Sequence, residues 1–228
     1  KTGSGKSTLA QNMFIDDIRN NKEKVKSILK EKVKGKLIIK QYPTKTPTIS
    51  TFYAHLQLLE AKEIKPDIII VDYADLIKGS HGTPYGGESY FFAKEVYEEL
   101  KGLGGLRECC VWSASQVKAD VYNNEIIYAE QTAEGSSKSH VVDFMLSISR
   151  TEKDKQAGTG RIYIAKARTK GDGILFPVLV DWAKARAIVL DKSEENLNTI
   201  NTLQDNSMSI ATREKLKKQL SKFLNSKG

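Results

Sequence analysis

The sequence contains only two cysteines and no long apolar run, and both shortages exclude classes of protein. The two cysteines, Cys109 and Cys110, are adjacent in an apolar, strand-like stretch, so they cannot form a disulfide framework. We therefore expect buried strand positions for both, and a reducing compartment such as the cytoplasm. Because no stretch of about 18 apolar residues occurs, we expect neither a membrane-spanning helix nor a membrane partner.

Basic residues outnumber acidic ones, with 36 Lys and Arg against 28 Asp and Glu, which gives a formal net charge of +8. This excess suits a polyanionic partner, although it does not indicate which one. Many of the lysines lie in helix-like stretches such as residues 22–36, where a solvated helix face is the simpler explanation. The length of 228 residues and the apolar content of 39% fit one large globular domain, or one and a half.

The first residues, KTGSGKST, match most of a phosphate-binding loop. The pattern is Gly, four residues, then Gly-Lys-Ser/Thr, and its first glycine would lie one position before Lys1. In such a loop backbone N–H groups surround the phosphates, Lys6 reaches the β- and γ-phosphates, and the Ser7 hydroxyl ligates Mg²⁺. The alternative is an accidental Gly/Ser loop before a helix. The predicted nucleotide-binding residues are Gly3, Ser4, Gly5, Lys6, Ser7 and Thr8.

An apolar run that ends in an acid supplies the expected partner of this loop. Residues 68–71 read Ile-Ile-Ile-Val, which is typical of a strand buried on both faces. Asp72 follows at its carboxyl end, where open α/β sheets bind their ligands. We therefore expect Asp72 to act as the Walker B acid and to hold Mg²⁺ together with Ser7. The alternative is an acid that caps the next helix.

The order of apolar patterns predicts an α/β fold with a mostly parallel central sheet, flanking helices and an antiparallel-like edge. Expected helices span 16–34, 48–64 and 91–103, and expected strands span 36–43, 68–71, 109–117, 140–150, 160–168, 176–181 and 186–190. In the second of these helices, Phe52, Leu56 and Leu59 share one face. Two long polar loops, 79–90 and 118–139, separate the later elements.

The composition changes near residue 190. Residues 191–208 are polar and are predicted to be a linker. Residues 209–228 read as a basic amphipathic tail helix, with Ser209 as its cap. This tail docks on its own domain or binds a partner, and the sequence leaves both interpretations open. Its apolar face would consist of Ile210, Leu216, Leu220 and Leu224.

Several segments together resemble the ATPase domain of hexameric replicative DNA helicases of the DnaB type, in particular its T-even phage members. The segments are GSGKST, LIIKQYPTKTPT, IIIVDYADLIKGS, VWSASQV, VVDFMLSISR and IYIAKARTKGDG, and they cover most of residues 1–190. The resemblance implies a RecA-like P-loop ATPase over this range. It also implies a ring, expected to be hexameric, that uses ATP or GTP with Mg²⁺ to translocate on single-stranded DNA, and it adds a primase and a helicase loader as partners.

The resemblance also implies roles for individual residues. Gln116 would sense the γ-phosphate, since a neutral amide can hydrogen-bond a phosphate on one side and a mobile loop on the other. Lys166 and Arg168 match the family's trans-acting pair, which touches the γ-phosphate held by the neighbouring subunit and stabilises the transition state. Strand alternation places both on one face. The alternatives are a glutamine that caps a turn and two solvated charges on an edge strand.

The two polar loops are the candidates for DNA contact in this architecture. Gly86 and Gly87 permit close approach of backbone to phosphate, and Lys118 and Lys138 supply charge. Contacts to the DNA backbone would give sequence-independent binding of one strand. Ordinary surface loops are an equally good interpretation of any single residue among them.

One departure from the family pattern concerns the catalytic base. The family places a strand ending in Glu soon after the P-loop helix, whereas here Phe14 is followed by IDDIRNNKEKVK, which has no apolar strand. We expect that residues are missing there and that an upstream part, including an N-terminal collar domain, precedes Lys1. A Cα separation much beyond 3.8 Å between Phe14 and Ile15 would show such a break.

Two other functions share parts of this pattern. A RecA-type recombinase would share the P-loop, the Walker B acid and the DNA loops, but the Lys-Ala-Arg element of residues 166–168 favours the helicase. A small-molecule P-loop kinase needs a substrate lid rich in Arg, and the basic charge and the long strands after Asp72 fit that poorly.

Overall fold

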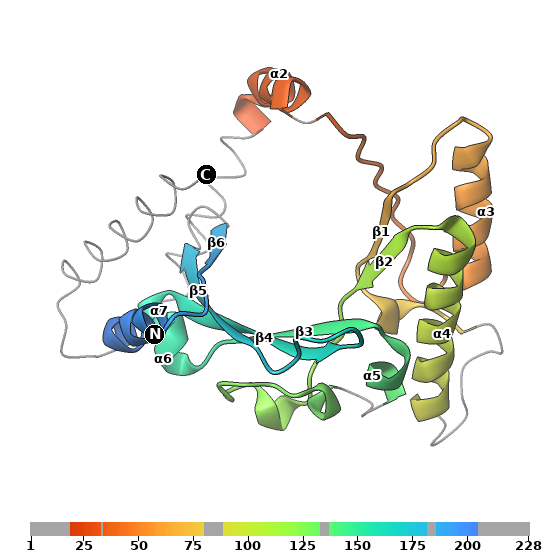
Figure 1. Cartoon of the computed structure of the whole chain (residues 1–228). Helices are drawn as coiled ribbons and strands as arrows, with labels where there is room; N and C mark the ends of the chain where they lie inside the picture. The colour runs from red at the N-terminus through yellow and green to blue at the C-terminus, as the bar shows by residue number, and fades with distance from the viewer. Residues whose placement is uncertain (1–18, 33, 80–88, 133–136, 182–185, 205–228) are drawn as a thin grey trace. The chain divides into compact units, whose positions relative to one another are not determined.

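The computed structural model describes residues 19–32, 34–79, 89–132, 137–181 and 186–204 (Figure 1). The chain divides into two compact units, of which unit 1 comprises Lys1–Lys40, Arg150–Ile162 and Leu175–Gly228, and unit 2 comprises Gln41–Ser149 and Tyr163–Ile174. The chain therefore passes between the units several times, which the predicted single boundary at residue 190 does not describe. Within the described part, no helix combines the length and the apolar character needed to cross a membrane.

The parallel strand pair of unit 2 confirms the two strands predicted around the candidate site. β1 (Ile68–Val71) pairs in parallel with β2 (Cys110–Ser113), with Ile68 opposite Cys110 and Val71 opposite Ser113. The prediction that this sheet is buried on both faces is wrong, since Ile68 and Ile70 are 57% and 76% exposed. Cys110 is exposed as well, so the expectation of two buried cysteines is also wrong. The other face carries the packing, because Ile69 and Val71 lie against the core.

Two helices supply that core of unit 2. α3 (Ile49–Glu60) begins after Thr48, whose side chain accepts a hydrogen bond from the backbone of Thr51, as a capping residue should. The predicted apolar face of α3 is confirmed: Leu56 is buried, and Phe52 and Leu59 pack against the same cluster. α4 (Ser89–Arg107) contributes Val96, Tyr97, Leu100 and Leu103 to the cluster.

α4 packs against β2 (Figure 1), and one glycine of α4 lies where the two elements meet. A Cβ placed on Gly104 would lie 3.0 Å from the carbonyl oxygen of Cys109 and 3.0 Å from Cγ2 of Val111. Gly102 and Gly105, in the same helix, would meet nothing within 4 Å. Gly104 is therefore the position at which the helix needs the absence of a side chain.

Five further elements of unit 2 have six residues or fewer each. They are η1 (Ala74–Leu76), η2 (Ala119–Val121), η3 (Ala129–Gln131), α5 (Ser137–Val141) and β3 (Phe144–Ser149). The predicted polar loop 118–139 thus contains two 3₁₀ turns and the start of a helix. Residues 140 and 141, predicted to begin a strand, end α5 instead.

The strand predicted at residues 36–43 does not form. This segment carries no helix or strand in the structure, and Leu37 and Ile39 are 80% and 82% exposed. An apolar run becomes a strand only where a neighbouring strand supplies its hydrogen bonds. The charged helix that precedes it, α2 (Lys22–Lys32), lies within the predicted range of 16–34.

Unit 1 contains an antiparallel hairpin-like pair and a helix packed on it. β5 (Leu175–Asp181) pairs with β6 (Arg186–Val189), and α7 (Glu194–Gln204) buries Ile200 and Leu203 against Leu179 and Leu190. The prediction of a linker over 191–208 is therefore wrong for residues 194–204. The apolar residues at 197, 200 and 203 recur at helical spacing inside a polar sequence, and burial of this stripe stabilises the helix. The predicted tail helix lies outside the described residues.

β4 (Thr159–Ala167) belongs to both units, and the strand order of the second sheet is β3-β4-β5-β6. The strand pairs given above comprise one parallel pair, β1–β2, and one antiparallel pair, β5–β6. The expected antiparallel edge is consistent with β5–β6, and a mostly parallel central sheet stays a prediction.

A buried carboxylate organises unit 1. Asp154 lies in α6 (Glu152–Ala157) with no exposure, and its oxygens accept hydrogen bonds from Thr151, Thr159, Arg161 and Gln204. Burial alone would raise the pKa of Asp154, but the hydrogen bonds from Thr159 and Thr151 and the charge of Arg161 hold it below its ordinary value. The group therefore ties α6, β4 and α7 together as a carboxylate.

Candidate functional site

The carboxyl ends of β1 and β2 form one edge of the parallel sheet, as the register requires. Ser113, opposite Val71, donates a hydrogen bond to the carbonyl oxygen of Val71 at 3.0 Å and accepts one from the backbone N–H of Ala74 at 2.9 Å. Both segments that leave the sheet are thereby fixed to each other. Asp72 lies at this edge with an exposed side chain, followed by a cis peptide bond to Tyr73.

Gln116 lies at the same edge. Its side-chain amide donates a hydrogen bond to the hydroxyl of Tyr73 at 3.2 Å, so Gln116 contacts the residue that follows Asp72. Gln116 is exposed, and its Nε2 carries a second N–H besides the one that it donates to Tyr73. The structure therefore brings two predicted site residues, Asp72 and Gln116, to one sheet edge, and the sensing role of Gln116 stays a prediction.

Lys138 lies elsewhere than expected. The sequence predicts a surface-loop lysine that contacts DNA, but Lys138 is in α5 and its side chain has no exposure. Its ammonium group donates to Asp75 Oδ1 at 2.7 Å and to Ser115 Oγ at 2.9 Å. The expected position on a surface loop is therefore wrong for Lys138, whose charge lies in a buried ion pair, and its contact with DNA stays a prediction.

Lys166, in β4, and Arg168, the residue after β4, contact the segment where α5 ends and β3 begins. The side chain of Lys166 donates to the carbonyl oxygen of Ser139. Arg168 contacts Asp143 twice: its Nη1 lies 3.1 Å from Asp143 Oδ1, and its backbone N–H donates to the Asp143 carbonyl oxygen at 2.9 Å. Both predicted residues therefore share one neighbourhood, as a two-pronged group requires. Whether they act on a neighbouring subunit stays a prediction.

Electrostatics at this junction favour the charged form of Asp143 and disfavour the charged form of Lys166. The hydrogen bond from Lys101 to Asp143 at 2.6 Å, with the charges of Lys101 and Arg168, outweighs partial burial and lowers the pKa of Asp143. Partial burial and the nearby charge of Arg168 lower the pKa of Lys166. Asp143 thus remains an anion that holds Lys101 and Arg168 on either side.

The other predicted site residues divide into two groups. Lys118 is exposed, at the start of η2, where its N–H donates to the Gln131 carbonyl oxygen at 3.1 Å. The remaining residues lie outside the described part of the chain: Gly3, Ser4, Gly5, Lys6, Ser7, Thr8, Gly86 and Gly87. The proposed break between Phe14 and Ile15 lies outside it as well.

A magnesium site would depend on Asp72 and Ser7, of which the structure describes only the first. The carboxylate of Asp72 is a hard oxygen ligand of the kind Mg²⁺ prefers, and its exposure leaves room for the waters that this ion retains. Asp72 therefore fits a Mg²⁺–nucleotide site. Among the described residues, no group of three or more His, Cys, Asp and Glu could hold a metal by itself.

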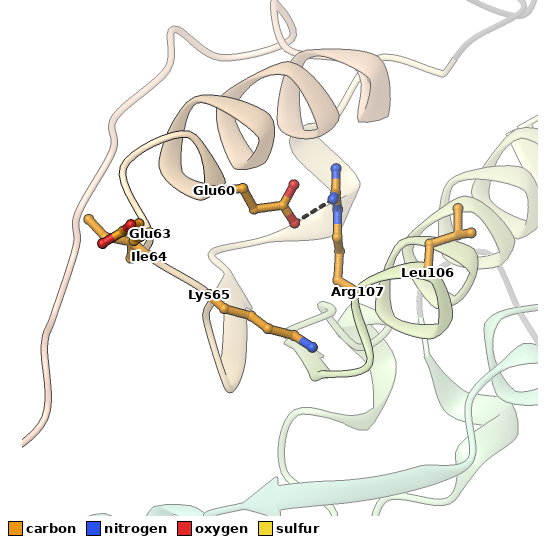
Figure 2. A pocket seen from close by; sticks show the side chains of 6 residues that line it. All are labelled: Glu60, Glu63, Ile64, Lys65, Leu106 and Arg107. Carbon is orange, nitrogen blue, oxygen red and sulfur yellow. Dashed lines mark hydrogen bonds and ion pairs between the residues drawn. The ribbon is translucent and has the colours of Figure 1, made fainter.

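A hollow of about 400 Å³ lies at the opposite end of β1 (Figure 2). Its lining includes Lys65, which precedes β1, and an ion pair between Arg107 and Glu60. Because Asp72 follows the other end of the same strand, the hollow is not part of the candidate site. The lining residues are Glu60, Glu63, Ile64, Lys65, Leu106 and Arg107.

The sequence did not reveal the residues whose hydrogen bonds and ion pairs join the segments of the candidate site. Ser113, Tyr73 and Asp75 lie in segments that carry the family resemblance, within three positions of a predicted site residue or strand end, but no role was predicted for them. Asp143 gave a weak signal, since an acid directly before a strand often pairs with a basic residue on the next one. Their contacts are long-range in the sequence, so spacing alone could not reveal them.

Comparisons with known proteins confirm the resemblance. No protein-family model matches the chain. The DnaB-like replicative helicase of Enterobacteria phage T4 is 35% identical over 120 residues, which is 52% of this chain and 25% of the relative. The chain therefore spans about a quarter of the length of this curated relative.

Solved structures give the fold. One solved ATPase domain superposes with a TM-score of 0.54 at 14% identity, over 64% of this chain and 52% of that one. A DnaB-like replicative helicase, whose structure was solved to show its interactions with primase, gives a TM-score of 0.50 at 13% identity, over 60% of this chain and 34% of that one. At these identities the likeness concerns the fold alone, and the fold is that of the solved ATPase domain.

Proposed function

From the similarity of this chain to DnaB-like replicative helicases, we propose that it is the ATPase part of a ring-shaped motor that translocates on single-stranded DNA and unwinds duplex at a replication fork. The observation that carries the proposal is the shared sheet edge at which Asp72 and Gln116 lie together, on the fold of the solved ATPase domain. The matching 120 residues at 35% identity support the same interpretation.

In this proposal the nucleotide binds at the carboxyl edge of β1 and β2. The P-loop residues hold the phosphates, with Lys6 on the β- and γ-phosphates, and Asp72 and Ser7 hold Mg²⁺. Mg²⁺ held by these two residues would neutralise the negative charge that develops on the phosphates. Gln116 hydrogen-bonds the γ-phosphate through its amide, and its contact with Tyr73 keeps the amide beside Asp72.

Lys166 and Arg168 complete the reaction centre of an adjacent subunit. Positive charge delivered to the γ-phosphate in the transition state can accelerate hydrolysis about 10³-fold or more. In the single chain, Asp143 pairs with Arg168, so Arg168 must exchange this carboxylate for the neighbour's phosphate. Because both side chains of that pair are more than half exposed, the exchange costs little.

The DNA surface of the proposed motor is formed by Lys118 with Gly86 and Gly87. Lys118 is exposed, and backbone contacts from the glycines would bind one strand without sequence preference. A hexameric ring would place these loops on the encircled strand. A primase and a helicase loader are the protein partners we expect, and the solved DnaB-like relative was studied with primase.

A RecA-type recombinase is not favoured, because the relatives are replicative helicases. Electron microscopy with a nucleotide analogue separates the two functions, since closed rings indicate the motor and open helical filaments the recombinase.

The proposed function is tested by unwinding of a forked duplex. We expect the Arg168→Ala variant to lose unwinding while it retains nucleotide binding, since Arg168 acts on the neighbour's site and not on its own. The matched control is Lys153→Ala, which removes an exposed positive charge from α6 and should unwind like the wild type. Normal unwinding by Arg168→Ala would remove the trans-acting role, and a wild type without unwinding would remove the motor.

A further inference from the structure

Lys138 has no role in the proposed function so far, although its environment is unusual. It is fully buried, whereas lysine is almost never fully buried unless it is paired. Burial of a charge carries a desolvation penalty that an apolar side chain of similar size would avoid. A lysine at this position therefore needs an explanation beyond packing.

The contacts of the Lys138 side chain lie on the segments that leave β1 and β2. Its ammonium binds Asp75 and Ser115, and the Ser115 hydroxyl itself donates to Asp75 Oδ2 at 3.2 Å. The centre of the Tyr97 ring is 5.5 Å from the ammonium, and the Tyr97 hydroxyl donates to Asp75 Oδ1 at 3.4 Å. Lys138 thus closes a polar cluster in which every charge has a partner.

This cluster adjoins the Asp72 edge directly. Asp75 is three residues after Asp72, and Ser115 is the residue before Gln116. The segments that follow β1 and β2 are therefore joined by two hydrogen bonds, one from Gln116 to Tyr73 and one from Ser115 to Asp75. A change in the position of Gln116 must therefore be transmitted to Ser115 and to the Lys138 ammonium.

The backbone of α5 holds the other predicted group. The residue after Lys138 is Ser139, whose carbonyl oxygen accepts the hydrogen bond from Lys166. The carbonyl oxygen of Val141, two residues further, accepts from Lys101 at 3.0 Å. Lys101 in turn binds Asp143, the partner of Arg168. The five-residue helix α5 therefore contacts the Asp72 edge through one side chain and Lys166 through its backbone, while Arg168 contacts Asp143, two residues after the helix.

We propose that Lys138 is a positioning residue that couples the Asp72–Gln116 edge of a subunit to the Lys166–Arg168 pair of the same subunit. The inference rests on the proposed function, in which these two groups serve different nucleotides. Lys138 and Ser139, whose carbonyl oxygen accepts from Lys166, are adjacent in α5, so a shift of this backbone displaces both contacts. The nucleotide bound at a subunit's own site thereby sets the position of the Lys166 and Arg168 side chains that this subunit offers to its neighbour.

A purely structural role for Lys138 makes a different prediction. If Lys138 only stabilises the fold, its effects on activity should follow its effects on stability. If it positions the two groups, activity should remain low even when stability is restored. Removal of both charges separates the two roles, because a buried ion pair can be replaced by neutral groups with little loss of stability, whereas removal of one partner leaves an uncompensated charge.

The experiment compares Lys138→Met with the double variant Asp75→Asn/Lys138→Met in the full chain. The matched control is Lys62→Met, an exposed lysine after α3 that contacts no site residue given above. Each variant is measured for melting temperature, for affinity for a fluorescent ATP analogue, and for kcat and KM of ATP hydrolysis with and without single-stranded DNA. The control should match the wild type in all of them.

We expect Lys138→Met to lower the melting temperature by about 5 °C or more, because Asp75 is left without its buried partner. The double variant should recover most of that loss. Its affinity for the analogue should stay near the wild-type value, while its DNA-stimulated kcat should remain reduced about 10- to 100-fold, as misplacement of reacting groups predicts.

Recovery of the wild-type kcat by the double variant would overturn the proposal, and so would a wild-type kcat in Lys138→Met. Failure of the proposed function is recognised separately, since the wild-type protein would then show no stimulation of ATP hydrolysis by single-stranded DNA at low salt.

Discussion

At the scale of single residues, the buried ionisable groups of this chain differ from the exposed ones in the number of their hydrogen-bond partners. Lys138 in unit 2 and Asp154 in unit 1 are both fully buried, and both have several hydrogen-bond partners. In contrast, Arg168 and Asp143 are more than half exposed, where solvent screens their attraction. The buried charges are therefore each held by several partners, whereas the exposed pair is free to exchange partners.

Asp154 should contribute to stability in a way that depends on pH. Because its pKa is lowered in the folded state, the unfolded chain binds the proton more readily, and the contribution of Asp154 is present above about pH 4 and lost as the pH falls. At neutral pH we expect Asp154→Asn to lower the free energy of unfolding by about 3 kcal/mol, since Arg161 loses its buried partner.

Chemical denaturation across pH 3–7 measures this effect, with Asp191→Asn, an exposed acid of the same unit, as the control. The difference between wild type and Asp154→Asn should shrink toward low pH. Equal stabilities of the two proteins at pH 7 would show that the carboxylate does not hold α6, β4 and α7 together.

At the scale of elements, the strongest sequence patterns were the ones the structure confirmed. The apolar run at 68–71 became β1 and the amphipathic stretch at 48–64 became α3. The first is a continuous apolar run that ends at an acid, and the second has apolar residues at helical spacing after a capping threonine. α6 and α7 were missed. The signals for them were a Thr151–Asp154 capping box for α6 and a Leu197–Ile200–Leu203 stripe for α7, both inside polar sequence.

The approach of α4 to β2 predicts opposite effects of one substitution at two glycines. Gly104→Ala should destabilise the protein by about 1–3 kcal/mol, because the new Cβ meets the Cys109 carbonyl, which cannot move without shifting β2. Gly102→Ala should stabilise it by about 0.5–1 kcal/mol, because its Cβ meets nothing and alanine is the better helix former. Thermal or denaturant unfolding of both variants measures the difference, and a stabilising Gly104→Ala would contradict the close packing.

The docking of α7 is tested in the same way. Leu203 has no exposure, so Leu203→Ala should cost about 2–5 kcal/mol through lost burial and the cavity left behind. Asn201→Ala, at an exposed position of the same helix, should change stability by less than about 0.5 kcal/mol. If both variants unfold like the wild type, residues 194–204 are a linker, as the sequence alone suggested.

At the scale of the whole molecule, the sequence predicted the strand ends of the candidate site better than the long-range contacts around them. The strand that leads to Asp72 and its edge shared with Gln116 follow from local patterns and from the geometry of parallel strands. The burial of Lys138 could not be predicted, because its partner Asp75 is 63 positions away and only the fold brings them together. The division into two units likewise depends on long-range packing, which one-dimensional periodicity does not contain.

The central claim is that each nucleotide site is completed by the adjacent subunit, and a mixing experiment tests it. Lys6→Ala lacks its own phosphate contact but keeps Arg168, whereas Arg168→Ala keeps an intact phosphate site but lacks the group offered to its neighbour. Each variant alone should hydrolyse ATP poorly in the presence of single-stranded DNA.

The measurement is the DNA-stimulated ATPase rate of the two variants after they are mixed and reassembled, compared with each variant alone. We predict a clear recovery of hydrolysis, because in mixed assemblies some Arg168→Ala subunits receive Arg168 from a Lys6→Ala neighbour. A mixture no more active than the two variants measured separately would contradict the account, since the reaction centre would then lie within one subunit.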